Sequence, residues 1–227
     1  LAYDNALYKL SPKDETMVRI NKDGPPIIQM FKLSSDEMSF VTGSGQILKV
    51  TYRQDLGRYK MLNYFRLPER TTVYHIRKDA EGDIWTMTDK CLYKNGKSFL
   101  YLPAYEYLTM DGQLFFGSSR GRIIRISKGV PEIIYTNVNS DIRIMRNIPG
   151  TKKIVIGSGP GGIYTLDTET LDVISDGSIP FYSGDLISKI DVNGNIWLFS
   201  RNGGLYNFNP QKNEILPFFN PLMQHGW

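Results

Sequence analysis

The sequence predicts an all-β fold built from repeated four-stranded antiparallel units. Three observations predict it: one turn-and-strand pattern recurs along the 227 residues, the composition favours strands, and no stretch keeps a helical period over three turns. The 14 Tyr and 11 Phe pack well on a pleated surface, and the 21 Gly and 12 Pro supply the turns that many short strands need.

The recurring pattern is clearest in two segments, Asp79–Thr88 and Asp191–Ser200. Each opens with an Asp-x-x-Gly turn, continues into an apolar strand that contains a Trp, and is followed by a polar loop and a Leu-Tyr pair. In the turn, Asp accepts hydrogen bonds from backbone amides and Gly adopts backbone angles closed to other residues. The residues that define the repeat are Asp79, Gly82, Trp85, Tyr93, Asp191, Gly194, Trp197 and Tyr206.

Weaker copies extend the repeat over the chain. The Tyr-like position of the pattern falls at residues 8, 48, 93, 124, 164 and 206, which are 40, 45, 31, 40 and 42 residues apart. A spacing of roughly 40–45 residues is that of a four-stranded β-propeller blade. The fold class is therefore a β-propeller, with about five complete blades and a partial one at this spacing.

The blade boundaries are expected near residues 26, 70, 104, 141 and 184 within a single domain over 1–227. In the last blade the strands are expected at Leu186–Ile190, Ile196–Ser200, Leu205–Phe208 and Ile215–Phe218, and the least repeat-like region, Gln54–Tyr59, as an extended hairpin between the third and fourth strands of a blade. The chain is expected to open on the third strand of a blade, at Leu7-Tyr8. We expect a fragment of a seven-bladed ring, and a compact five-bladed ring is the alternative.

The motif resembles the two-component regulator propeller repeat, and Asp79–Tyr93 and Asp191–Pro210 match it closely, while the other copies lack the Trp. The resemblance implies the periplasmic sensor region of a bacterial hybrid two-component histidine kinase, a family that often controls polysaccharide use. It implies a sensor module without enzymatic activity of its own, with the kinase elsewhere in the parent protein. The implied partners are an oligosaccharide ligand, further propeller blades and signalling domains of the parent chain, and a homodimer is a further option.

Composition argues against several other classes. The net charge of +4 is spread along the chain, so no nucleic-acid partner is expected, and no apolar run approaches the length of about 20 residues that crosses a bilayer. Cys91 is the only cysteine, which excludes an internal disulfide. The alternating oxygen ligands of Asp79-x-Glu81-x-Asp83 do not have the spacing of a calcium-binding EF-hand loop. No metal, cofactor or catalytic residue is assigned.

Topology places the candidate ligand-binding residues. Because the strands of a blade run antiparallel, the loops between its second and third strands and the loops that lead to the next blade share one face, at the mouth of the central channel. Arginines, amides and tyrosine rings there are suited to hydroxylated or acidic sugars. The candidates are Arg70, Asp89, Lys90, Tyr105, Arg120, Tyr182, Arg201 and Asn202.

Two other functions are weighed against the sensor. One is a propeller lyase or hydrolase with His75 as its base, since His75 lies in a first strand, next to the ring centre. The other is a scaffold propeller that docks a protein. The glycine-rich segment Gly157–Gly162 superficially resembles a phosphate loop, but it runs into a strand and no Lys-Ser/Thr pair follows.

Overall fold

The strands pair antiparallel with their neighbours in sequence and build a series of small sheets. The computed structural model describes residues 2–3, 6–11, 16–19, 26–35, 37–53, 55, 58–158, 162–177, 186–200 and 204–219. Within these residues it forms one three-stranded sheet followed by five four-stranded sheets, each with its strands in sequence order.

The first three sheets consist of β1 (Ala2–Tyr3), β2 (Ala6–Ser11) and β3 (Thr16–Arg19); of β4 (Ile27–Lys32), β5 (Glu37–Thr42), β6 (Gln46–Arg53) and β7 (Arg58–Arg66); and of β8 (Val73–Lys78), β9 (Ile84–Thr88), β10 (Leu92–Lys94) and β11 (Lys97–Leu100). The last three consist of β12 (Glu106–Met110), β13 (Gln113–Gly117), β14 (Arg122–Ser127) and β15 (Val130–Tyr135); of β16 (Ile142–Asn147), β17 (Lys153–Ser158), β18 (Gly162–Asp167) and β19 (Val173–Gly177); and of β20 (Leu186–Ile190), β21 (Ile196–Ser200), β22 (Gly204–Asn209) and β23 (Glu214–Phe219).

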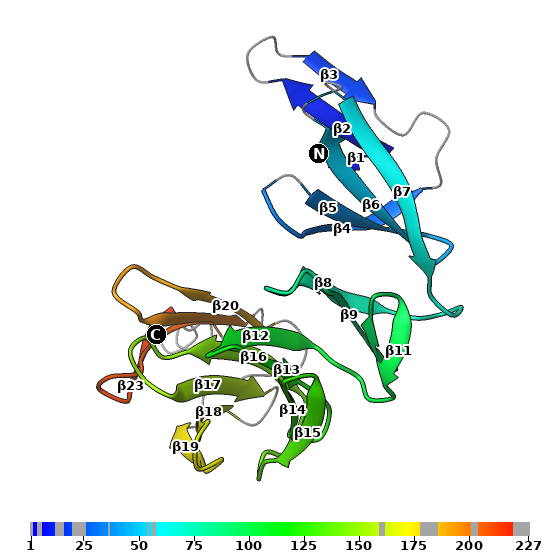
Figure 1. The fold of residues 1–227 in the computed structure, drawn as a ribbon. Coiled ribbons are helices and arrows are strands. Elements are labelled where there is room, and N and C mark those ends of the chain that lie inside the picture. Colours follow the sequence, from blue (N-terminus) through cyan, green and yellow to red (C-terminus); the bar gives the residue numbers. More distant parts are fainter. Residues whose placement is uncertain are drawn as a thin grey trace. The chain divides into compact units, whose positions relative to one another are not determined.

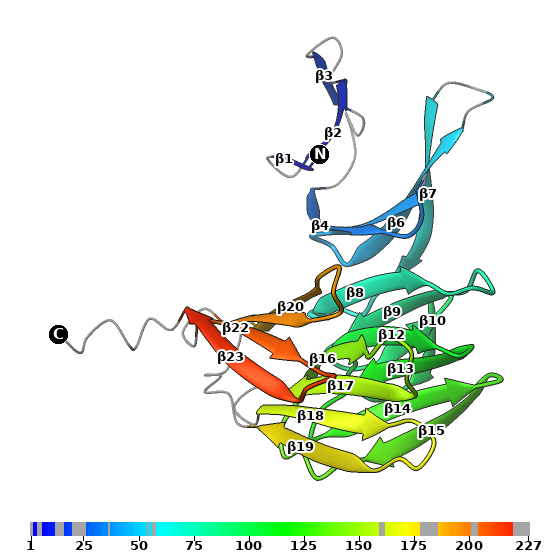
Figure 2. The ribbon, with the colours of Figure 1, turned by 90° about the vertical axis from the view of Figure 1, so that its left-hand side faces the viewer.

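The chain divides into two units, Leu1–Pro103 and Ala104–Trp227, and each is described by itself. In the first unit, β4 and β8, the first strands of the two four-stranded sheets, lie next to each other (Figure 1). In the second unit, β12, β16 and β20 follow one another in the same way (Figure 2). Neighbouring sheets within each unit are therefore arranged as β-propeller blades, with their first strands together.

This arrangement confirms the predicted fold class. Five of the Tyr-like positions lie in β6, β10, β14, β18 and β22, the third strands of the five four-stranded sheets, and the first lies in β2, the middle strand of the three-stranded sheet. The expected long hairpin is β6 and β7, whose pairs Tyr52–Tyr59 and Arg53–Arg58 lie beyond the last residue paired with β5 (Figure 2). The opening sheet begins earlier than expected, because β1 pairs with β2 ahead of Leu7-Tyr8.

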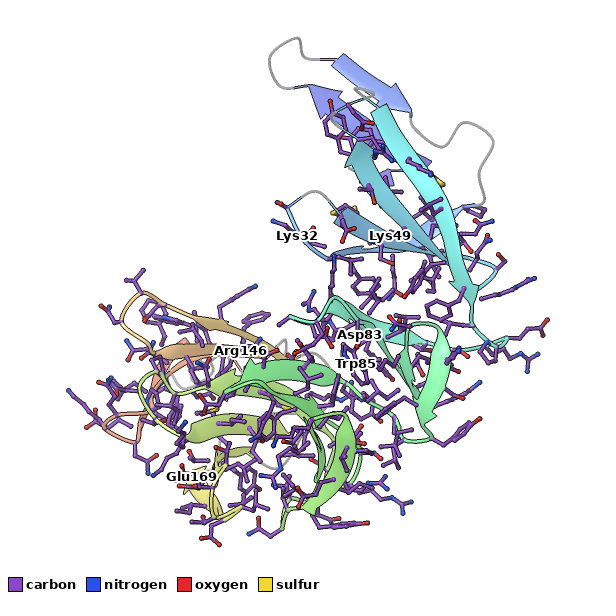
Figure 3. All side chains as sticks on the ribbon, viewed as in Figure 1. Lys32, Lys49, Asp83, Trp85, Arg146 and Glu169 are labelled. Carbon is purple, nitrogen blue, oxygen red and sulfur yellow. The ribbon has the colours of Figure 1, made fainter. Side chains whose placement is uncertain are left out.

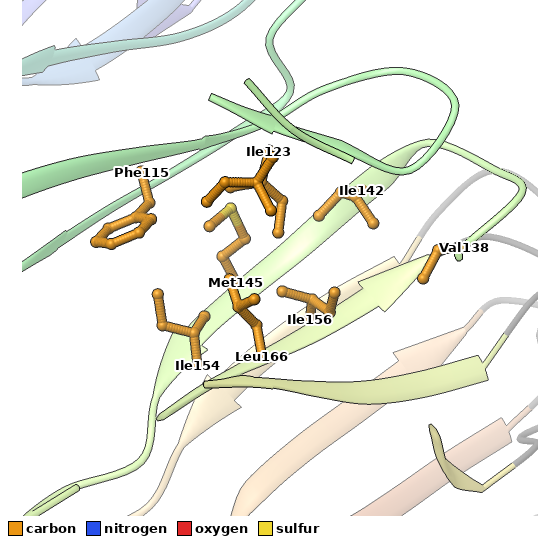
Figure 4. Packing of buried hydrophobic residues seen from close by; sticks show 9 residues of the cluster. Phe115, Ile123, Val138, Ile142, Met145, Ile154, Ile156 and Leu166 are labelled. Carbon is orange, nitrogen blue, oxygen red and sulfur yellow. The ribbon is translucent and has the colours of Figure 1, made fainter. Parts of the chain in front are cut away.

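The core lies between the sheets. Figure 4 shows one cluster, in which Phe115 and Ile123 of one sheet meet Met145, Ile154 and Ile156 of the next. Val155, between those last two residues, points the other way and packs with Leu198 of the following sheet. Since Ile154, Val155 and Ile156 are all fully buried, β17 is covered on both faces, which explains its continuous apolar sequence.

The Asp-x-x-Gly-x-Ile-Trp pattern folds as a hydrogen-bonded unit that links a turn to a strand. The Asp79 carboxylate accepts hydrogen bonds from the Asp83 amide at 2.8 Å and from the indole Nε1 of Trp85 at 2.7 Å (Figure 3 labels Asp83 and Trp85). Asp191 accepts the indole N–H of Trp197 in the same way, at 3.0 Å. The repeat needs Asp and Trp six residues apart because a buried indole N–H requires an acceptor.

Desolvation of Asp191 acts to raise the pKa of its carboxyl, but the hydrogen bonds from Trp197 and Asn195 outweigh it and hold the pKa below its usual value.

Polar contacts between neighbouring sheets recur at the spacing of the sequence repeat. Lys78 binds Glu37, 41 residues away, and Arg146 binds Glu106, 40 residues away (Figure 3 labels Arg146). Lys152 binds Asp111, again 41 residues away. One repeat of sequence therefore advances the chain by one sheet, and these ion pairs join equivalent regions of adjacent blades.

The Glu37 carboxylate joins two sheets and makes stability depend on pH. It lies 2.6 Å from Lys49 of its own sheet and 2.7 Å from Lys78 of the next, and these hydrogen bonds hold the pKa of Glu37 below its usual value of 4.5. The stabilisation is thus complete above pH 4.5 and is lost as the pH falls through the lower pKa of the folded state.

We expect Glu37→Gln to reduce the free energy of unfolding at pH 7 by about 1–2 kcal/mol, because the charge that attracts both lysines is removed. The loss is no larger because both lysines are partly exposed and water screens the ion pairs. Below pH 4.5 the difference from the wild type should shrink as the pH falls. Urea unfolding of both proteins between pH 7 and pH 3 measures it, and a difference that stays constant over this range would contradict the assignment.

Candidate ligand-binding site

A pocket of about 430 Å³ lies in the first unit, at the edge of the sheet β4–β7. Its walls are the loop between β5 and β6 and the segment that leads from β7 to β8, which is the pair of loop types predicted to carry ligands. Its volume lies within the range of about 300–1,000 Å³ found for small-molecule sites. The lining residues are Ile28, Val41, Thr42, Gly43, Ser44, Gly45, Arg66, Pro68, Glu69, Arg70 and Thr71.

The charged part of the lining is predominantly cationic. Arg66 and Arg70 contribute two exposed guanidinium groups, and Glu69 contributes one carboxylate. A guanidinium presents a planar fork of N–H donors that matches the paired oxygens of a carboxylate or sulfate. Ser44 adds an exposed hydroxyl, and Ile28, which is 58% exposed, adds an apolar surface for a C–H face. The pocket is thus suited to a polar, anionic organic ligand.

The local sequence fixes the wall between β5 and β6. Thr42 Oγ1 accepts the Gln46 amide at 3.0 Å and shares a hydrogen bond with the Ser44 hydroxyl at 3.0 Å. Gly45, at a φ of 77°, closes the turn and donates its amide to the Thr42 carbonyl. Because the carbonyl of Gly45 accepts the Leu67 amide at 2.9 Å, this turn is tied directly to the segment that carries the arginines.

Two of the predicted ligand contacts, Asp89 and Lys90, lie beside this segment but do not line the pocket. Asp89 Oδ1 accepts the Thr72 amide at 2.9 Å, and Lys90 Nζ donates to the carbonyl oxygens of Arg70 at 3.1 Å and Glu69 at 3.4 Å. The structure therefore brings Arg70, Asp89 and Lys90 together, with only the arginine in the lining.

Two further predicted contacts, Tyr105 and Arg120, lie in the second unit. The guanidinium carbon of Arg143 lies 4.6 Å from the centre of the Tyr105 ring, and Arg143 also pairs with Asp141 at 3.0 Å. Arg120 is exposed in the loop between β13 and β14, with a φ of 55°. Next to it, the Gly121 amide donates to the Ser140 carbonyl at 2.7 Å, so this loop is bound to the one that leads into β16.

The remaining predicted contacts, Tyr182, Arg201 and Asn202, fall outside the residues that the structure describes. Conversely, the loop Thr42–Gly45, which forms one wall of the pocket, is not among the predicted contacts. The sequence holds a signal for it: Ser39–Thr42 precedes Ile47-Leu48, the Leu-Tyr-like pair of this copy, as a second strand of the repeat does, and the loop after a second strand belongs to the predicted ligand face.

A second hollow, of about 610 Å³, lies in the second unit between the turns that join β12 to β13 and β16 to β17. Its charged residues, Asp111 and Lys152, already form an ion pair at 2.6 Å. Since their charges neutralise each other, this hollow offers an anionic ligand less than the first pocket does.

His75 belongs to β8 and is half-buried. Its ring packs edge-on against Phe31 of β4, with 6.4 Å between the ring centres. In the part of the chain that the structure describes, no three His, Cys, Asp or Glu side chains are grouped as a metal centre. The same residues contain no helix long and apolar enough to span a membrane.

Comparison with known proteins shows a structural likeness. No protein-family model and no curated protein matches the sequence. The extracellular domain assigned to a hybrid two component system of B. thetaiotaomicron superposes on 87% of this chain with a TM-score of 0.62 and 16% identity, and the chain spans 32% of that domain. BamB from Moraxella catarrhalis matches 94% of this chain over 72% of its own, with a TM-score of 0.62 and 12% identity.

The WD40 β propeller domain of Doa1 matches 85% of this chain over 82% of its own, with a TM-score of 0.50 and 9% identity. At such low identities the likeness concerns the fold alone. Together with the arrangement of the sheets, it shows that this chain is built from β-propeller blades.

Proposed function

We propose that this chain is a ligand-binding sensor module of a two-component signalling protein, located outside the cytoplasm, and that its pocket takes an acidic oligosaccharide. The observation that carries the proposal is the pair of arginines, Arg66 and Arg70, in a pocket of about 430 Å³ on the loops of the predicted ligand face. Likeness in fold to an extracellular domain of a two component system supports the signalling context.

The chemistry of the lining favours an acidic sugar over a neutral one. Arg66 and Arg70 can each form paired hydrogen bonds with a carboxylate or sulfate, and hydrogen bonds to charged groups contribute about 1.5–3 kcal/mol. The Glu69 carboxylate can accept hydrogen bonds from sugar hydroxyls, and the exposed apolar surface of Ile28 can pack against the C–H face of a sugar ring. A sensor of this type binds without turnover, and we propose no catalytic role for His75.

The proposal predicts binding that depends on both the charge of the sugar and the Arg70 side chain. A panel of acidic oligosaccharides, each with its neutral counterpart, is titrated by calorimetry; trigalacturonate and its methyl ester form the first pair, since they differ in the carboxylates alone. We expect an acidic member to bind, its neutral counterpart to bind at least tenfold more weakly, and Arg70→Ala to weaken the acidic one by at least tenfold, about 1.4 kcal/mol.

Arg53→Ala is the matched control for Arg70→Ala. Arg53 is an exposed arginine of the same unit, paired with Asp55 outside the pocket, so its removal changes the net charge equally and should leave the affinity unchanged. Equal losses in the two variants would mean that the net charge of the unit, and not the pocket, binds the sugar. A panel in which no acidic sugar binds would contradict the proposed ligand.

A further inference from the structure

The segment that carries Arg70 is held by the neighbouring sheet. The loop between β9 and β10 supplies four hydrogen bonds to it, all from two residues. Asp89 accepts the Thr72 amide through its carboxylate at 2.9 Å and donates its own amide to the Thr72 carbonyl at 3.1 Å. Lys90 Nζ donates to the carbonyl oxygens of Glu69 and Arg70. The pocket wall is thus attached to a sheet that contributes nothing to the pocket's lining.

The backbone at Arg70 needs such support. Its φ of 56° lies in the left-handed region, which is unfavourable for a residue with a Cβ atom. The peptide groups on either side of the Arg70 Cα atom carry the carbonyls of Glu69 and Arg70, and Lys90 Nζ donates a hydrogen bond to both. Within the segment, the Thr71 hydroxyl donates to the Pro68 carbonyl at 2.8 Å. The conformation that places Arg70 in the lining is therefore maintained largely from outside the segment.

We propose that Lys90 and Asp89 are positioning residues of the pocket, which hold Arg70 for the ligand through their hydrogen bonds to residues 69–72. They do so without contacting the ligand, which distinguishes this role from the direct contact expected from the sequence. The inference rests on the proposed function for its ligand, but the holding of the loop is a property of the unliganded protein.

The first measurement is made without ligand. Lys90→Ala should speed hydrogen exchange of the Thr72 amide, which binds the neighbouring Asp89 carboxylate, by about tenfold, because local opening of the segment loses its restraint, while the melting temperature changes little. Lys90→Arg, which keeps a cationic donor, should restore most of the protection. Lys97→Ala removes an exposed lysine of β11 in the same sheet and should leave exchange of the Thr72 amide unchanged. Equal exchange in Lys90→Ala and the wild type would overturn the proposal.

The second measurement is calorimetric titration of the same variants with trigalacturonate, or with the acidic oligosaccharide that binds the wild type. Lys90→Ala should raise the Kd about three- to tenfold and Lys90→Arg should return it towards the wild-type value. An unchanged Kd in Lys90→Ala would overturn the positioning role. If no acidic sugar binds the wild type, the proposed ligand fails, while the exchange data alone decide whether Lys90 holds the loop.

Discussion

Replacing Gly121 with alanine is expected to destabilise the second unit by about 3–5 kcal/mol, among the largest effects that a single methyl group can have. A Cβ atom at this position would lie 1.9 Å from the Val138 carbonyl oxygen and 2.8 Å from the Thr136 hydroxyl. The residue also has a φ of 67°, which disfavours any L side chain. To relieve the clash, the loop between β13 and β14 must move away from the loop that leads into β16.

That movement breaks the hydrogen bonds between the two loops. The Gly121 amide donates to Ser140, and the Gly121 carbonyl accepts both the amide and the hydroxyl of Thr136, the latter at 2.7 Å. These bonds fix the path from one blade to the next and the backbone beside Arg120, so their loss leaves partly buried polar groups without partners as well as adding strain.

Gly129→Ala is the matched control, because it separates backbone strain from steric clash. Gly129 has a φ of 78°, yet nothing lies within 4 Å of its would-be Cβ atom. Gly129→Ala should reduce the free energy of unfolding by about 1 kcal/mol through backbone strain alone. Urea unfolding of the two variants, followed by circular dichroism, gives the comparison. Similar losses in both would show that the contact between the loops is not as close as the structure has it.

Removing the carboxylate of Asp79 is expected to cost about 2–3 kcal/mol, because Asp79→Ala leaves the indole N–H of Trp85 buried without its acceptor. Trp85 is 1% exposed, so water cannot replace the carboxylate. The Asp83 amide loses its partner at the same time, which loosens the turn between β8 and β9.

A double-mutant cycle isolates the indole bond. In a Trp85→Phe background the N–H is already absent, so Asp79→Ala should cost only about 1 kcal/mol, the value of the turn hydrogen bond. Asp111→Ala serves as the control: Asp111 lies in the corresponding turn of the next blade, but it is half exposed and pairs with Lys152 instead of a tryptophan. Asp111→Ala should reduce the free energy of unfolding by no more than about 1 kcal/mol. Additive effects of the two changes at 79 and 85 would contradict the assigned bond.

The fold could be predicted from the sequence because the same local chemistry is repeated. Asp79 and Trp85 bond within a single turn and strand, so their spacing carries the information without any distant contact. Tyr93 and Tyr206 lie in third strands, β10 and β22, as the repeat requires. The strand β1 escaped notice because two residues carry no alternation of apolar and polar side chains that a pattern could detect.

The site was predictable only in its general place. Topology puts the loop Thr42–Gly45 and the segment that contains Arg70 at one edge, but whether a hollow remains there depends on how side chains fill the space between them. The sequence also cannot tell whether a charged loop residue faces a ligand or the backbone. Lys90 binds carbonyl groups 20 and 21 residues earlier, and nothing local distinguishes it from a lysine in solvent.

The most direct test of the proposed site is a hydrogen-exchange footprint of the wild-type protein with and without a saturating acidic oligosaccharide that binds it. Protection is expected to increase in two segments far apart in sequence, 42–45 and 66–72, which together form the pocket of Arg66 and Arg70. Protection confined to residues 109–112 and 147–152, around the second hollow, or absent from both loops of the first pocket, would contradict it.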